Sequence, residues 1–280
     1  MSGPSTLRAQ DHAGDVLTRS LGPTAPAPFG VPGADLGALV DREDPRGWRW
    51  VLGTGDRTVR RYPVPAATPS YGELAVRTAG HGRLAPATWS GVLAQVGAAL
   101  ARLHALPAPD HPPPALARLA DFLDARPVDP ARRRRRDRFV DALGPDMLAG
   151  LRADCRAALR PATAVLSHGW AGLGTWFATG PGAAVGVVGE DHGAAAPEHD
   201  LGAVLGQVVE LAHLVPWFAE VCPVAEARAR LLAGYGRPVD QDRLDREVRL
   251  AITRHVADYA VHTRLREADL ATYAALVVSL

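Results

Sequence analysis

The sequence predicts an α+β fold in two lobes, with a small β-containing lobe first and a larger, mostly helical lobe after it. Three observations favour this fold. Aromatic and β-branched residues gather in two short segments, residues 48–62 and 175–188, and each contains a glycine-rich turn typical of a hairpin. Several other segments carry apolar residues at helical spacing. The length of 280 residues fits one large domain or two coupled lobes.

Composition limits the class of protein. The hydrophobic fraction is 47%, which supports a packed core, and the formal net charge of +1 gives no global field that favours nucleic acid or a membrane surface. No apolar run approaches the ~20 residues of a membrane span, and no signal peptide is evident. All 31 basic residues are arginine, which indicates a GC-rich coding bias. Cys155 and Cys222 show no metal-ligand spacing and favour a reduced, cytoplasmic compartment, with a single disulfide between them as the alternative.

The N-terminal part is expected to be an arm followed by the small lobe. Residues 1–33 are rich in Pro and Gly and are predicted to be loosely ordered, with one helix near residues 15–20. Residues 34–86 are predicted to form the small lobe. In it, residues 48–62 make a hairpin around a Gly-Thr-Gly-Asp turn, and residues 70–80 make a short helix that carries Glu73.

Residues 87–280 are expected to form a helical lobe with a central β-hairpin insert. Its clearest helix spans residues 88–106, capped by Thr88 or Ser90. A strand at residues 164–166 precedes the hairpin of residues 175–178 and 185–188. The further helices are expected at residues 115–125, 139–159 with a break near Gly144, 201–214, 224–235, 240–265 and 269–280.

A run of five arginines, residues 132–136, has two interpretations. The simpler one is a solvated helix start. The functional one is a docking patch for phosphate or for an acidic peptide.

One region carries a motif. Residues 166–177 read Leu-Ser-His-Gly-Trp-Ala-Gly-Leu-Gly-Thr-Trp-Phe, and residues 187–202 contain Gly-Glu-Asp-His-Gly followed by Pro-Glu-His-Asp-Leu-Gly. This order resembles the aminoglycoside-phosphotransferase family. There a His-Gly-Asp loop with a downstream Asn precedes a hairpin, an apolar-Asp-apolar metal motif and Pro-X-X-Asp-Leu. The resemblance covers about residues 48–280 and implies a bilobal, protein-kinase-like fold.

The chain departs from the family pattern where the chemistry lies. The resemblance places Trp170 at the catalytic Asp, Thr175 at the metal-holding Asn and Gly189 at the metal-binding Asp. Indole has no oxygen that accepts the proton of a substrate hydroxyl. The chain contains no lysine, so the Lys that grips phosphate in the family has no equivalent. Such losses predict a rate lower by several powers of ten.

Other residues are candidates for the missing roles. Arg60 or Arg61 could bind phosphate, paired with Glu73 as the family pairs its Lys with a Glu on the next helix, although exposed strand arginines are the alternative. Glu190 or Asp191 could hold Mg²⁺, with a solvated loop as the alternative.

The motif also keeps two residues. Asp200 matches a family residue that serves structure, and its carboxylate is expected to cap a helix that begins at Leu201. His168 usually supports the loop. These two, with Asp191, are the candidates for a catalytic role. Trp170 and Trp176 are expected either to fill the volume of the nucleotide and metal or to form an aromatic wall for a ligand.

The resemblance leads to two hypotheses of function. The first is a catalytically degenerate kinase-like protein that binds a peptide, a small molecule or a partner protein. The second is an active phosphotransferase, with ATP and Mg²⁺ as cofactors, acting on Ser/Thr hydroxyls of a peptide or on a small molecule. Relatives of this kind also occur beside lyases in peptide natural-product pathways of the lanthipeptide or thioamitide type. A peptide, or a partner protein such as a lyase, is therefore the expected partner. An unrelated, mostly helical interaction protein is a third hypothesis.

Overall fold

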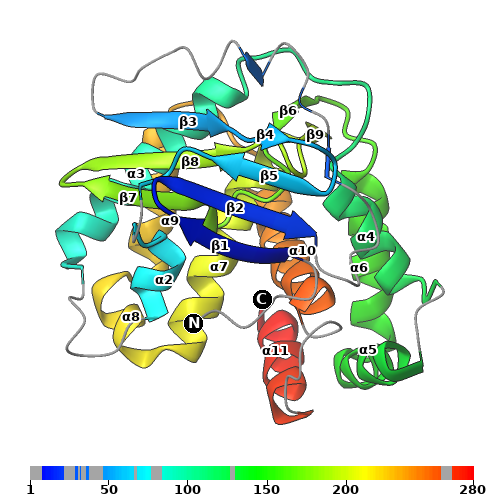
Figure 1. Cartoon of the computed structure of the whole chain (residues 1–280). Coiled ribbons are helices and arrows are strands. Elements are labelled where there is room, and N and C mark those ends of the chain that lie inside the picture. The colour runs from blue at the N-terminus through cyan, green and yellow to red at the C-terminus, as the bar shows by residue number, and fades with distance from the viewer. Residues whose placement is uncertain are drawn as a thin grey trace.

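A computed structural model gives the arrangement of the chain (Figure 1). It describes residues 8–21, 29–30, 32, 36–37, 47–65, 68–76, 84–126, 130–259 and 267–280. In this part of the chain, the strands gather at one end and most of the helices lie beneath and behind them. The predicted boundary between the arm and the small lobe, at residues 33 and 34, lies outside the described residues, and the predicted division into an arm, a small lobe and a helical lobe stays a prediction.

The first sheet begins with a hairpin that the sequence did not predict. β1 (Arg8–Ala13) pairs antiparallel with β2 (Val16–Leu21), and the sheet continues in the order β1-β2-β5-β4 through β5 (Val59–Tyr62) and β4 (Thr54–Gly55). Gly14, with φ of +56°, lies in the turn between the first two strands. The helix expected at residues 15–20 is wrong, because this segment alternates between buried and partly buried side chains with a strand's period of two.

The second sheet joins distant parts of the chain. β3 (Trp48–Leu52) runs parallel to β8 (Ala183–Val188), which pairs antiparallel with β7 (Trp176–Gly180). The hairpin expected at residues 175–188 is confirmed. The hairpin expected across residues 48–62 is wrong, because β3 pairs with β8 and only β4 and β5 form a local hairpin. Aromatic packing accompanies the long-range pairing, since the rings of Trp50 and Trp176 lie 4.5 Å apart between centroids.

A third, two-stranded sheet lies next to the motif. β6 (Val165–Ser167) pairs antiparallel with β9 (Gly193–Ala195). β6 leads into the loop of residues 168–172, which ends in the 3-10 turn η1 (Leu173–Thr175). The strand expected at residues 164–166 is therefore present, shifted by one residue.

The helices expected in residues 87–280 are present, with ends shifted by several residues. The described helices are α2 (Tyr71–Val76), α3 (Pro86–Leu103), α4 (Pro114–Leu123), α5 (Pro130–Leu143), α6 (Pro145–Ala158), α7 (Pro197–Leu214), α8 (Pro216–Val221), α9 (Val224–Tyr235), α10 (Gln241–Tyr259) and α11 (Glu267–Ser279). The end of the helix expected to reach residue 265 lies outside the described residues. No helix among those described is long and apolar enough to cross a membrane.

Proline decides where several helices begin. α3 starts at Pro86 and its N-cap residue, Ala85, makes no side-chain cap, so the cap expected at Thr88 or Ser90 is wrong. A proline at the first helical position loses no hydrogen bond and has the φ that a helix needs. Ser90 instead lies inside the helix and donates a hydrogen bond to Glu226 of α9 (2.7 Å).

Close helix contacts place the core beneath the sheets. α3 packs against α9, and α7 packs against α10 (Figure 1). Gly97 and Gly234 let α3 and α9 touch, because a Cβ at these positions would lie 2.2 Å from the Leu231 carbonyl oxygen and 1.9 Å from the Ala94 carbonyl oxygen. α7 is buried on most sides, and this fixes the position of its first turn, which carries Asp200.

Candidate functional site

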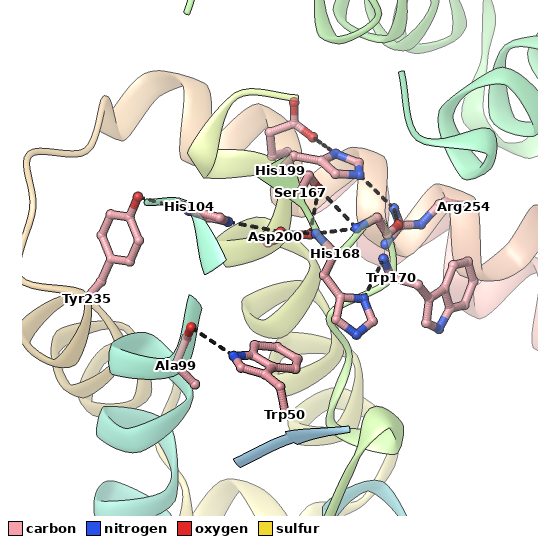
Figure 2. A network of polar contacts seen from close by, with 12 residues as sticks. Trp50, Ala99, His104, Ser167, His168, Trp170, His199, Asp200, Tyr235 and Arg254 are labelled. Carbon is pink, nitrogen blue, oxygen red and sulfur yellow. Dashed lines mark hydrogen bonds and ion pairs between the residues drawn. The ribbon is translucent and has the colours of Figure 1, made fainter. Parts of the chain in front are cut away.

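Asp200 anchors the loop that carries the motif. Its Oδ2 accepts a hydrogen bond from the backbone N–H of His168 (2.7 Å), and its Oδ1 accepts bonds from the Ser167 hydroxyl (2.9 Å) and from the Gly169 N–H (3.1 Å). The Nε2 atom of His104, at the end of α3, lies 3.0 Å from Oδ2. Figure 2 shows these groups converging on Asp200 from separate parts of the chain.

This carboxylate is an ionised structural group. Burial acts to raise the pKa of Asp200, but the hydrogen bond and charge of His104, with the nearby His199 and His168, bring it far below its ordinary value. The side chain is completely buried, so it cannot touch a substrate. The helix cap expected from Asp200 is wrong: α7 begins at Pro197, which puts Asp200 one turn inside the helix, with its carboxylate directed at the loop.

His168 is also committed to the fold. Its Nε2–H donates to the Val187 carbonyl oxygen (2.7 Å), and its Nδ1 accepts from the Trp170 backbone N–H (3.2 Å). Burial lowers the pKa of His168, which agrees with a neutral ring that donates from one nitrogen and accepts at the other. The structure thus places this catalytic candidate in a supporting position for the loop.

The indole of Trp170 stacks against an arginine of α10. The Cζ atom of Arg254 lies 4.6 Å from the ring centroid, a cation–π geometry. The same guanidinium lies 3.0 Å from the Gly169 carbonyl oxygen and 3.1 Å from Nε2 of His199 (Figure 2). His199 in turn contacts Glu247 of α10 (3.0 Å). Where the resemblance places a catalytic carboxylate, the structure has an aromatic ring over a buried cation.

The two positions that match metal ligands in the family, 175 and 189, are buried or crowded in this structure. The hydroxyl of Thr175 is buried and donates to the Gly172 carbonyl oxygen (2.7 Å). Gly189 has a φ of +108°, and a Cβ there would lie 2.8 Å from Cδ1 of Leu52. An aspartate at position 189 would therefore be both strained and crowded in this backbone conformation.

The two adjacent carboxylates face arginines from different elements. Glu190 accepts a hydrogen bond from the hydroxyl of Tyr62 (2.7 Å) and lies 3.5 Å from Arg19 of β2. Asp191 accepts bonds of 2.9 and 3.3 Å from Arg118 of α4.

Arg118 also contacts Asp258 of α10 at 3.4 Å. Burial opposes the charge of Arg118, but Asp191 and Asp258 raise its pKa, so the three groups form a charged network.

The predicted phosphate-binding group is not assembled. Arg60 is buried, and its guanidinium donates to the carbonyl oxygens of Gly53 and Gly55, at 3.4 Å each, and to that of Gly30. Arg61, its neighbour on β5, is exposed. Glu73 and Arg60 make their described bonds to other groups, and the phosphate-binding role expected of Arg61 stays a prediction.

Glu73 instead belongs to a capping box with Ser70. Oε2 of Glu73 accepts from the Ser70 N–H (2.7 Å), and the Glu73 N–H donates to the Ser70 hydroxyl (3.1 Å). The Ser-X-X-Glu spacing at residues 70–73 was the sequence signal for this alternative.

Three arginines of the site were missed from the sequence. Arg19 donates to the Gly174 carbonyl oxygen (3.1 Å) and lies over the rings of Tyr62 and Phe177, at about 6 Å from each centroid. Arg118 and Arg254 lie on helices far from the motif in the sequence. In a chain with 31 arginines, nothing local distinguishes these three from the rest.

In this structure Glu190, Asp191 and Arg60, the candidates for binding Mg²⁺ and phosphate, are bonded to other parts of the protein. Mg²⁺ prefers several oxygen ligands in octahedral geometry. Among the described residues no group of three or more His, Cys, Asp and Glu side chains could hold a metal ion. Glu190 and Asp191 face cations, and Arg60 is surrounded by carbonyl oxygens.

Trp176 and Trp170 have different positions. Trp176 is fully buried and packs against Trp48 and Trp50 in the core between the second sheet and α3. Trp170 is partly exposed beside Arg254. Trp176 is therefore core, whereas Trp170 is the aromatic group of the pair that can face a ligand.

Comparisons with known proteins bear on the fold. No protein-family profile and no curated protein sequence matches the chain. A solved glucosamine kinase, in complex with glucosamine, ADP and inorganic phosphate, has a TM-score of 0.55 at 17% identity, covering 94% of this chain and 71% of that one. The choline kinase LicA from Streptococcus pneumoniae has a TM-score of 0.54 at 9% identity, covering 100% and 92%.

A third similar structure is the spectinomycin phosphotransferase APH(9)-Ia, solved with ADP and spectinomycin. It has a TM-score of 0.53 at 13% identity and covers 95% of this chain and 83% of that one. Identities this low concern the fold alone. The chain thus has the bilobal, kinase-like fold of the aminoglycoside phosphotransferases and choline kinases, with a small β-containing lobe and a mostly helical one.

Proposed function

We propose that this chain is a kinase-like protein without phosphoryl-transfer activity, which acts by binding a peptide or a partner protein. One observation carries the proposal. At the positions where the resemblance expects free catalytic and metal-binding groups, the side chains are bonded to, or packed against, other parts of the protein.

Phosphoryl transfer needs cations on the phosphates, Mg²⁺ on oxygen ligands and a carboxylate that orients the acceptor hydroxyl. At each position that should meet one of these requirements, the side chain either has another partner in the protein or is of the wrong chemical type. Arg60 holds backbone carbonyl oxygens, Asp191 is paired with Arg118, and position 170 carries an indole. A catalyst built here would have to break these contacts first.

The cost of breaking them is large. Removing one partner of a buried ion pair typically costs ~3–5 kcal/mol, because the other charge stays buried without compensation. A metal ion on Asp191 would compete with Arg118, and its positive charge would lie beside that guanidinium. The network of paired charges therefore disfavours the binding of Mg²⁺, which the kinase reaction requires.

The proposal that the partner is a peptide or a protein comes from the resemblance to the family. Kinase-like proteins of this family occur beside lyases in pathways of the lanthipeptide or thioamitide type, where a non-catalytic member could present the peptide in the cytoplasm. The exposed part of Trp170 supplies an aromatic surface of the kind that peptide ligands contact.

A transfer assay tests the proposal. The purified chain is incubated with Mg²⁺ and ATP labelled at the γ-phosphate, first alone and then with Ser/Thr-containing peptides and with choline, glucosamine and spectinomycin. We expect no label on any acceptor and no release of phosphate above the blank. Mg²⁺-dependent labelling of any acceptor that is abolished by Asp191→Asn would overturn the proposal and make the chain an active phosphotransferase.

A further inference from the structure

We infer that β1 is an interface at which two copies of this chain pair, with their β1 strands antiparallel and Gln10 of one copy opposite Gln10 of the other. This inference goes beyond the proposed function and does not depend on it. β1 forms the lower border of the first sheet in Figure 1. No strand among the described residues pairs with its outer side.

The hairpin of β1 and β2 determines which backbone groups of β1 point outward. A two-residue turn joins the strands, and such a turn closes on a hydrogen-bonded pair, here Ala13 and Val16. Bonded and non-bonded pairs alternate along an antiparallel ladder. Arg8, Gln10 and His12 therefore belong to the non-bonded pairs of the ladder with β2.

A hydrogen bond on the far side of β2 agrees with this alternation. Leu21 is the residue opposite Arg8, and its N–H donates to the Thr58 carbonyl oxygen (2.9 Å), away from β1. The backbone N–H and C=O groups of Arg8, Gln10 and His12 therefore point to the outer edge of the sheet. They present donors and acceptors that match those of another extended strand.

The two edges of this sheet differ. At the other edge, β4 has only two residues, and a short edge strand is one way in which proteins prevent unwanted pairing. β1 has six residues, without proline or lysine, and its register with β2 contains no bulge. Its formal charge is zero, because Arg8 and Asp11 balance. Like charge therefore does not keep two β1 strands apart.

Two copies of this edge have one favoured register. Outward-facing residues must lie opposite one another to form bonded pairs. A twofold axis at Gln10 places Arg8 opposite His12 of the second copy, so that all the outward-facing residues are used in about six backbone hydrogen bonds. A register shifted by two residues leaves one of them without a partner in the strand.

A second copy is favoured over a flexible peptide. Ordering a free peptide in an extended conformation costs conformational entropy at every residue. β1 of a second copy is already extended, because its own β2 holds it. The same backbone bonds therefore give a higher net affinity for a second copy than for a short disordered peptide.

Sedimentation velocity of charge variants at Gln10 tests the register. In it residue 10 lies directly opposite itself, where like charges repel and opposite charges attract. We expect the wild type to dimerise as its concentration rises, and Gln10→Glu and Gln10→Lys each to weaken the dimer about three- to five-fold. An equimolar mixture of the two variants should associate more tightly than either alone. The controls Thr54→Glu and Thr54→Lys, at the β4 edge, should stay within about two-fold of the wild type.

A proline tests the backbone bonds. Gln10→Pro removes an N–H that points outward, so the ladder with β2 keeps its bonds, and proline is tolerated at such an edge position. Dimerisation should weaken about ten-fold or more, because both copies lose a donor. Circular dichroism and the urea midpoint should stay close to those of the wild type. Gln10→Thr, which keeps the N–H, is the control and should still dimerise.

Several results would overturn the inference. They are a wild type that stays monomeric, a dimer that Gln10→Pro leaves intact, and no gain in association when the Glu and Lys variants are mixed. The mixture keeps the inference testable if Gln10→Pro fails to fold. A monomeric chain that binds a labelled peptide of the β1 sequence would assign this edge to extended peptides instead.

Discussion

Two regions of the kinase-like motif show opposite relations to the family pattern. Around Asp200 the residues match the pattern and are held in a buried hydrogen-bonded network. Around Trp170, Thr175 and Gly189 they depart from it. These positions hold a cation–π contact, a hydrogen bond to a backbone carbonyl oxygen and a glycine packed closely against Leu52. The comparison teaches that the loop can keep its conformation without the residues that the family uses for catalysis. Asp200 holds the loop through buried hydrogen bonds, whereas phosphoryl transfer needs side chains that remain accessible to a ligand.

The largest effect is expected at the anchor. Asp200→Asn should lower the free energy of unfolding by about 3–5 kcal/mol, because the amide cannot accept from His104, Ser167 and two backbone N–H groups as the carboxylate does. Urea unfolding measures it. Asp245→Asn, which alters an exposed pair with Arg228, is the control and should cost less than about 1 kcal/mol. Equal losses in both variants would show that the buried network is not special.

The ion pair between Asp191 and Arg118 should have a smaller effect on stability. Asp191→Asn should cost about 2 kcal/mol, because Arg118 loses one partner but keeps Asp258. Asp121→Asn, whose pair with Arg126 is more than half exposed, should change stability by about 0.5 kcal/mol or less. Urea unfolding with a saturating excess of Mg²⁺ sharpens the test. Stabilisation of the wild type by Mg²⁺ that disappears in Asp191→Asn would mean that this carboxylate binds metal after all.

The sequence predicted the parts of this fold that depend on local signals. The helices of residues 87–280 follow apolar periodicity, and the hairpin of β7 and β8 follows its Gly-Pro-Gly turn. The hairpin of β1 and β2 was missed because the segment is surrounded by Pro and Gly and has no aromatic residue. The parallel pairing of β3 with β8 joins residues more than a hundred positions apart, and no local pattern reveals it.

The site divides in the same way. The resemblance predicted the kinase-like fold, which is confirmed, whereas the departures at positions 170, 175 and 189 stay a prediction. It did not show that the carboxylate of Asp200 faces the loop rather than capping α7. The helix begins at Pro197, four residues before Leu201, so Asp200 lies inside the helix and not at its N-cap. The partners Arg19, Arg118 and Arg254 come from β2, α4 and α10, so only the three-dimensional contacts reveal them.

Acid should destabilise the protein through its neutral buried histidines. Burial lowers the pKa of His192 to about 4, with His111 adding to the effect and Asp191 opposing it, and burial also lowers the pKa of His168. Below the ordinary pKa of about 6.5 the unfolded chain binds protons that the folded chain does not. Stability should therefore fall as the pH drops from about 6.5 towards 4, by at most ~1.4 kcal/mol per pH unit for each group.

The variant His192→Gln measures the contribution of one histidine to this dependence of stability on pH. Urea unfolding at several pH values should give a shallower fall for His192→Gln than for the wild type. His255, whose pKa Glu210 raises against the effect of burial, titrates in the opposite sense but contributes equally to both proteins. Identical slopes would mean that His192 does not stay neutral in the folded chain.

The smallest change in stability is expected from restoring the family residue. Trp170→Asp removes the stack on Arg254 but gives that guanidinium a carboxylate partner, so the net change should be within about 1 kcal/mol. Phosphate transfer should stay at the blank, because Asp191 remains paired with Arg118. The transfer assay described above checks both proteins. Transfer activity in Trp170→Asp would show that the rest of the site is intact and that a single residue had removed the chemistry.

Calorimetric titration of the wild-type protein with ATP, with and without Mg²⁺, tests the central claim most directly. If the groups around the loop are committed to the protein, no metal-dependent heat should appear up to millimolar ATP. Mg²⁺-dependent binding in the micromolar range would contradict this account, because a metal and a triphosphate would then have displaced arginines and carboxylates that the structure holds together.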